Sequence, residues 1–280
     1  MYLPPDYETA INKRYPVVYT YWGQLMFNIH DDSSELNLDR LLTDAFYNSS
    51  SCDVFKWGLI VVAIEALSTK LASNMEYIVS PEVDGCRSAN LIRTISGSFK
   101  RHIHEHFRTI NQWNYTTLIG FSTAGGLVFD QLTKYYSLFG RIVILSWILD
   151  EDCCESEVEI SDALATTRLF RHRNVLKPTY FYPKIFFTWT AYEEPAEITR
   201  ARDTAKGLRH RGLPISFIYV DPINTTNTTA QFYGAQVMKA ICWAFNNQTA
   251  ESYSDIAPWW DEQDLTENQT ILSPMQTNKK

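Results

Sequence analysis

The sequence predicts an α/β fold, with a mostly parallel central sheet and helices on both of its faces. Short apolar runs rich in β-branched and aromatic residues alternate along the chain with longer stretches in which apolar residues recur at helical spacing. The short runs are apolar throughout, which is typical of strands that are buried on both faces of a parallel sheet. Parallel strands joined through a helix make right-handed crossovers, and these connections place the helices against the sheet.

Six short segments are predicted to be strands of this sheet. The first two read PVVYTY and LIVVAI, and neither contains a charged residue. The other four, TTLI, RIVIL, IFFTW and ISFIYV, have the same β-branched and aromatic character. In chain order the six are residues 16–21, 59–64, 116–119, 141–145, 185–189 and 215–220.

Four longer segments are predicted to be helices. The clearest is residues 195–211, where apolar residues between Ile198 and Leu208 share one face. Its opening proline suits the first turn of a helix, and Gly212 suits the left-handed residue that ends one. The others are residues 92–108, 125–137 and 230–245.

Length and composition are consistent with one folded domain. With 280 residues, of which 45% are hydrophobic, the chain can bury a large core. No internal repeat or second domain is visible, and residues 1–245 are predicted to form a single domain. Residues 246–280 are polar and aperiodic, and are predicted to form a disordered tail.

Charge and hydropathy argue against several kinds of partner. The net charge of −7 and the lack of a basic block make nucleic acid and anionic membrane surfaces poor partners. No run of about 18 apolar residues exists, so no transmembrane segment is predicted. The N-terminus lacks the apolar core and cleavage site of a signal peptide, which slightly favours the cytoplasm.

The cysteines and the glycosylation sequons point to different compartments. None of the five cysteines has metal-ligand or CxxC spacing, and most are expected to be reduced. Six Asn-x-Ser/Thr sequons would accept glycans in a secreted chain, so the sequence leaves secretion open. The cysteines are Cys52, Cys86, Cys153, Cys154 and Cys242, and the sequons begin at Asn48, Asn114, Asn224, Asn227, Asn247 and Asn268.

A serine lies where the third predicted strand meets the following helix. The segment LIGFSTAGGLVFDQL, residues 118–132, frames Ser122 with Gly120 and Ala124. In a nucleophile elbow, small residues flank the serine because the strand and the helix approach closely at a sharp turn. The pattern G-x-S-x-A with this context predicts such an elbow. The alternative is an ordinary strand–helix turn with a solvated serine.

Several stretches together resemble the putative-esterase family of the α/β-hydrolase superfamily, which includes esterase D, feruloyl esterases and the catalytic domain of enterochelin esterase. The resemblance spans roughly residues 2–245, and it rests on the order and spacing of the stretches. It implies an α/β-hydrolase fold, and leaves open whether the first strands of that fold are missing. The stretches are YLPPDYETAINKRYPVVYTYWG, FKRHIHEHFRTI, IGFSTAGG, LFGRIVILSW and AYEEPAEITRARDTAKGLRHRGLPISFIYVD.

The resemblance also implies the parts of a serine-esterase site. Ser122 would be the nucleophile, and Glu194 the acid that orients the base, with Glu193 as a neighbour that could substitute. The backbone N–H groups of Thr123 and Gln24 would form the oxyanion hole. At the second position the family shows His-Gly and further glycines, whereas this chain has the bulkier WGQLMFN. The resemblance implies neither a metal nor another cofactor.

The catalytic histidine of the family has no counterpart here. The loop after the last strand reads VDPINTTNTTAQFYGAQ, with Thr228, give or take one residue, in the place of the histidine, and no histidine follows His210. Two histidines that could lie on the side of Ser122, His30 and His172, are candidate substitute bases. His102, His104 and His106 precede the serine strand, and are expected on a solvated face at the opposite edge.

Two functions remain from the sequence. The first is a serine esterase that hydrolyses small-molecule carboxylic esters, weakened by the missing histidine. The second is a catalytically inactive relative that keeps the fold and acts by binding. The acyl and alcohol groups of a substrate and the oligomeric state are left open.

Overall fold

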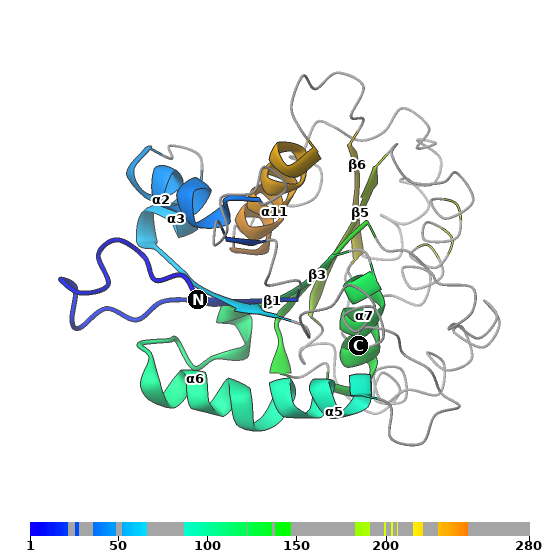
Figure 1. The fold of residues 1–280 in the computed structure, drawn as a ribbon, viewed down its shortest axis with the longest axis horizontal. Helices are drawn as coiled ribbons and strands as arrows, with labels where there is room; N and C mark the ends of the chain where they lie inside the picture. Colours follow the sequence, from blue (N-terminus) through cyan, green and yellow to red (C-terminus); the bar gives the residue numbers. More distant parts are fainter. Residues whose placement is uncertain are drawn as a thin grey trace, which may run out of the picture.

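The structure is a computed structural model. It describes residues 1–21, 26–27, 36–48, 52–65, 87–121, 123–135, 138–146, 183–190, 199, 203, 206, 215–220 and 229–245. Within these residues the chain forms one parallel sheet that is covered by helices on both faces (Figure 1). The predicted α/β architecture is therefore confirmed.

The sheet has six strands, all parallel, in the order β2-β1-β3-β4-β5-β6. All six predicted strands are present, with ends shifted by at most two residues. The largest shift is in β3, which runs two residues beyond the predicted end, as far as the residue before Ser122. The strands are β1 (Val17–Tyr21), β2 (Ile60–Ile64), β3 (Thr116–Phe121), β4 (Arg141–Leu145), β5 (Lys184–Thr190) and β6 (Ile215–Val220).

Alternate residues of the first five strands, β1 to β5, pack into two separate cores. In β1, Val17 and Tyr19 contribute to the core under α5 (Arg87–Thr94), α6 (Lys100–His106) and α7 (Thr123–Tyr135). Val18 contributes to the core on the other face. That face is covered by α2 (Leu38–Asn48), α3 (Asp53–Trp57) and α11 (Thr229–Phe245), as Figure 1 shows.

The helices agree less closely with the sequence than the strands do. The predicted helix over residues 92–108 is present as α5 and α6, which a π-helical segment (Ile95–Phe99) joins. Of the predicted helix over residues 195–211, Thr199, Asp203 and Lys206 are helical, and the other positions lie outside the described residues. The sequence did not predict α2, which has 11 residues, or α3, which has five; both cover the sheet near its β2 edge.

A disulfide joins Cys52, at the start of α3, to Cys242 of α11. It links two segments that are 190 residues apart, so no local spacing could have revealed it. The expectation that most cysteines are reduced is wrong for these two. Cys86, Cys153 and Cys154 lie outside the described residues, as does the predicted tail over 246–280.

Among the helices that the structure describes, none is both long enough and apolar enough to cross a bilayer.

Candidate active site

The strand order brings together the ends of the two strands that precede the predicted oxyanion segment and Ser122. From β1 the chain moves outward to β2, then returns to the other side of β1 to form β3. In open parallel sheets, ligands bind outside the carboxyl ends of the strands where the direction of winding reverses. Here that point lies between the ends of β1 and β3, at Tyr21 and Phe121. The predicted oxyanion segment follows Tyr21, and Ser122 follows Phe121.

The turn that carries Ser122 is short. Strand β3 ends at Phe121 and α7 begins at Thr123, so Ser122 is the one residue between them, although it lies outside the described residues. A strand joined to a helix through one residue is the connection that a nucleophile elbow requires.

Gly120 shows why the turn needs small residues. A Cβ built on Gly120 would lie 2.5 Å from the Cγ2 of Val128 and would also overlap the carbonyl oxygen of Ala124. Ala124 is itself fully buried. Strand β3 and helix α7 therefore touch backbone to backbone beside the serine, which no residue larger than glycine at position 120 permits.

The first residue of α7 is suitably placed to provide an oxyanion donor. Thr123 opens the helix, and the first N–H groups of a helix have no partner within it. The positive end of the helix dipole lies at the same place and favours a developing negative charge. Gln24, the other predicted donor, lies outside the described residues.

A buried hydrogen-bond chain holds the end of β1 to α7. The hydroxyl of Tyr21 donates to Oε1 of Gln131 over 2.7 Å, and Nε2 of Gln131 donates to Oγ of Ser96 over 2.6 Å. Tyr21 and Gln131 are almost completely inaccessible to solvent. The last residue before the oxyanion segment is thus fixed to the helix that begins after the serine.

Helix α11 approaches the serine turn from the other face. The ring of Tyr233 packs edge-on against that of Phe121, with centroids 4.5 Å apart. Tyr233 lies one helical turn after Thr229, where α11 begins. The loop in which the family carries its histidine leads directly into this helix, and residues 224–228, including Thr228, lie outside the described residues.

Buried polar groups continue along the carboxyl edge of the sheet. Ser146, just after β4, has a positive φ of 50°, a strained value for a residue other than glycine. Its N–H donates to the carbonyl of Thr188 over 2.8 Å. Within the described part of the chain, the hydroxyls of both residues and the amide of Gln236 are buried and have no hydrogen-bond partner. Backbone strain and unpaired polar groups of this kind are concentrated at functional sites.

The acid and the candidate bases are not placed by the structure. Glu194, Glu193, His30 and His172 lie outside the described residues, and their roles stay predictions. Strand β5, which ends at Thr190 shortly before the glutamates, lies two strands from β3.

His102, His104 and His106 lie at the opposite edge, where the solvated face expected for all three is wrong for His104, which is half-buried. His102 and His106 are exposed and stack on each other with centroids 4.0 Å apart. The Nδ1 atom of His104 lies 2.5 Å from the hydroxyl of Thr109, which pairs with Tyr15 just before β1. Burial, and secondarily Lys100, lowers the pKa of His104 to about 4. Among the described residues, no three His, Cys, Asp or Glu side chains group in a way that could hold a metal ion.

Solved esterase structures share this architecture. A ferulic acid esterase superimposes with a TM-score of 0.60 at 14% identity, with 86% of this chain and 89% of the other covered. The siderophore hydrolase EstA from Aspergillus nidulans gives 0.61 at 12% identity, over 87% and 89% of the two chains. An IroE-like serine hydrolase from Shewanella oneidensis gives 0.55 at 17% identity, over 97% and 80%.

Comparisons of sequence alone find no relative. No family model matches the chain, and no curated protein matches it. At such low identities the structural likeness establishes the fold alone. The chain has an α/β-hydrolase fold, as the resemblance predicted.

The structure also identifies residues near the site that the sequence reading missed. They are Tyr21, Gln131, Ser146 and Tyr233. The sequence signal for Gln131 was its helical spacing from Ala124, Leu127 and Val128, which places a polar residue on the apolar face of α7.

Proposed function

We propose that this chain is a serine hydrolase of small-molecule carboxylic esters, with Ser122 as its nucleophile. The observation that carries the proposal is the contact between Gly120 and α7, because it compresses a one-residue connection into the sharp turn that a nucleophilic serine uses. The position of this turn at the reversal of the winding direction supports the same assignment. The fold shared with solved esterases agrees with it.

The proposed reaction follows the usual steps of acyl transfer. The hydroxyl oxygen of Ser122 attacks the ester carbonyl while a base removes its proton, and the N–H groups of Thr123 and Gln24 bind the oxyanion. The alcohol leaves with a proton, and water then attacks the acyl-serine and releases the carboxylic acid. Glu194 would orient the base, and His30 or His172 would act as that base.

Turnover is proposed to be slow. The loop at residues 224–228 contains no histidine, and a general base contributes roughly 10²–10⁴ in rate. The bulkier oxyanion segment after Tyr21 would lower the rate further, since the loss of one oxyanion donor costs roughly 10²–10³.

The first substrates to test come from the structural neighbours. Their names mention ferulic acid and siderophores, so aryl-acyl esters and siderophore esters should be compared with short-chain 4-nitrophenyl esters.

The test combines labelling with turnover. An alkyl fluorophosphonate should label the chain at Ser122, and Ser122→Ala should lose both the label and the ester turnover. Ser98→Ala is the matched control, because Ser98 is an exposed serine on the segment between α5 and α6. Turnover that persists in Ser122→Ala would contradict the proposal. A folded chain with neither label nor turnover would favour the binding function.

A further inference from the structure

The disulfide carries information about where the chain folds. Cys52 and Cys242 have Cα atoms 5.8 Å apart, within the normal range for a disulfide, and Cys52 is almost completely buried. The bond ties α3 to α11 between segments that are far apart in the sequence. Such bonds form and persist in oxidising compartments, and are rare where glutathione keeps thiols reduced.

A glycosylation sequon lies four residues before the disulfide. Helix α2 ends at Asn48, which begins the sequence Asn-Ser-Ser. The side chain of Asn48 is exposed. An exposed asparagine at the end of a surface helix leaves room for a bulky glycan.

The second sequon among the described residues has a different environment. Asn114 is only half-exposed, and Thr116, which completes its sequon, is fully buried in β3. The hydroxyl of Thr116 donates to the carbonyl of Gln112 over 3.2 Å. This comparison selects Asn48 over Asn114.

We infer that the chain matures in an oxidising, glycosylating compartment, where Asn48 receives an N-linked glycan. The amide nitrogen of Asn48 bonds to C1 of the first sugar and loses a proton, and the lipid diphosphate of a lipid-linked oligosaccharide donor leaves. The thiols of Cys52 and Cys242 form their bond as a disulfide-bearing oxidant takes up two electrons and two protons. The inference is independent of the proposed esterase activity.

The first test uses the full chain isolated from its native cells. Peptide-N-glycosidase treatment in H₂¹⁸O should convert Asn48 to a labelled aspartate, and non-reducing digestion should yield a peptide that joins Cys52 to Cys242. An unmodified Asn48, or two cysteines that alkylate without reduction, would overturn the inference.

The second test assigns the glycan in the full chain, secreted behind a cleavable leader from a eukaryotic host. Asn48→Gln and Ser50→Ala should each migrate faster on a gel, by the shift expected for the loss of one glycan. Ser50→Thr, which keeps the sequon, should migrate as the parent chain does. If Asn48→Gln and Ser50→Ala migrate as the parent chain does, Asn48 is not the acceptor and the inference fails.

Discussion

The two edges of the sheet are built in different ways. At the amino edge, an ion pair and a hydrogen bond join side chains around one carboxylate. Lys13 pairs with Asp6 over 2.6 Å, and the hydroxyl of Tyr15 donates to the same carboxylate. At the carboxyl edge, Gly120 has no room for a side chain and Ser146 has a strained backbone. The amino edge stabilises the fold, whereas the strained carboxyl edge holds the proposed site.

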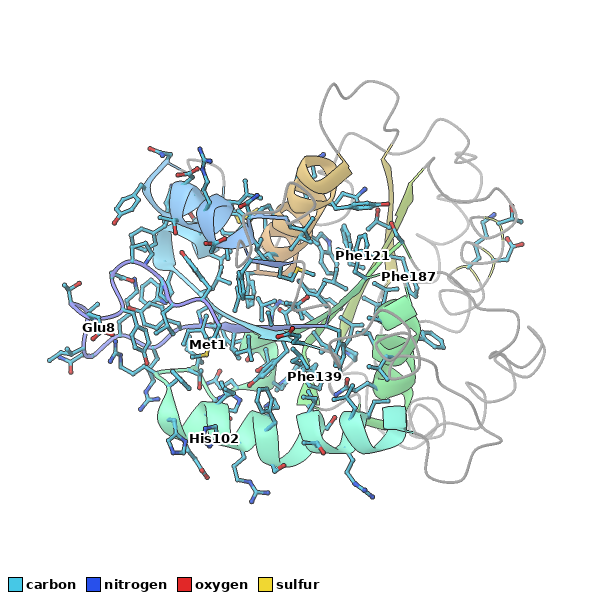
Figure 2. The ribbon with its side chains drawn as sticks, viewed as in Figure 1. Met1, Glu8, His102, Phe121, Phe139 and Phe187 are labelled. Carbon is cyan, nitrogen blue, oxygen red and sulfur yellow. A yellow bond between two sulfur atoms is a disulfide. The ribbon has the colours of Figure 1, made fainter. Side chains whose placement is uncertain are left out.

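Stabilising contacts at the amino edge can compensate for the stability that the strained carboxyl edge loses. Arg108 lies over the ring of Tyr7 at the amino edge, with its guanidinium carbon 3.8 Å from the ring centroid. Figure 2 shows the side chains crowded along the sheet, with Phe121 and Phe187 near its carboxyl edge and His102 on the helix below. Substitutions at the amino edge should change stability with little effect on turnover, and those at the carboxyl edge should change turnover most.

The largest expected effect is a gain of ester turnover from a substitution at the carboxyl edge. Thr228→His should raise the turnover of a 4-nitrophenyl ester by roughly 10²-fold, toward the lower end of the contribution of a general base, because the oxyanion segment is also altered. Asn227→His and Thr229→His should be tested beside it, since they flank the predicted position of the histidine. Initial rates of 4-nitrophenol release provide the measurement.

The control for this gain is the double variant Thr228→His, Ser122→Ala, which should show no gain. If all three histidine variants fold and none gains Ser122-dependent turnover, the site lacks more than its base.

The next effect tests the close contact at Gly120. Gly120→Ala should lower the free energy of unfolding by about 1–3 kcal/mol, because the new methyl group would overlap α7. It should also lower kcat/KM by about 10²-fold, because α7 can relax only by moving the residues next to Ser122. Urea unfolding and ester turnover should be measured on the same samples.

Gly97→Ala is the matched control, since a Cβ at Gly97 meets nothing within 4 Å. It should be neutral, or stabilising by up to about 1 kcal/mol, because alanine is the better helix former. Equal turnover in Gly120→Ala and Gly97→Ala would contradict the elbow geometry.

The sequence predicted the sheet because its signals are local. The run RIVIL at residues 141–145 has the length and β-branched composition of a buried strand, and β4 has those same limits. Helix α3 was missed because it has only five residues, and α2 because only Leu38 and Leu42 of its 11 residues are buried, which leaves a weak apolar pattern. Such helices depend on packing against the sheet more than on their own periodicity.

The site could be predicted only in part, for a related reason. The frame of Gly120 and Ala124 is a local pattern, so the turn was visible in the sequence. The contact between Phe121 and Tyr233 and the bond between Tyr21 and Gln131 join positions more than 100 residues apart. Only the folded chain brings such residues together, and the same holds for the disulfide.

A smaller effect is expected at the amino edge. Arg141 donates from Nε to the carbonyl of Ala244 and lies over the ring of Phe245, 5.0 Å from its centroid, so it caps the end of α11. Arg141→Met should lower the free energy of unfolding by about 1–2 kcal/mol, while turnover per folded molecule stays unchanged. Burial, and secondarily the positive charge of Arg141, lowers the pKa of Lys184. Removing this charge should stabilise protonated Lys184 and so offset part of the lost stability.

Arg40→Met is the control for this variant, because the ion pair of Arg40 with Asp44 is exposed and 3.9 Å long. Its effect should be below about 0.5 kcal/mol. A large loss of turnover in Arg141→Met would break the separation between the two edges.

The smallest effect is a pH dependence that belongs to the amino edge alone. The pKa of His104 is lowered to about 4 in the folded chain, mainly by burial, whereas an unfolded histidine titrates near 6.5. Between these values the unfolded chain binds more protons, so the stability contributed by neutral His104 is present above about pH 6.5 and is lost as the pH falls toward 4. Because the ring is only half-buried, we expect a loss of about 1 kcal/mol over this window.

His104→Asn, which keeps an amide for Thr109, should remove this component from the unfolding free energy measured by urea at a series of pH values. His106→Asn, an exposed position on the same helix, should leave it in place, and a component that survives in His104→Asn would assign the pH dependence to another group.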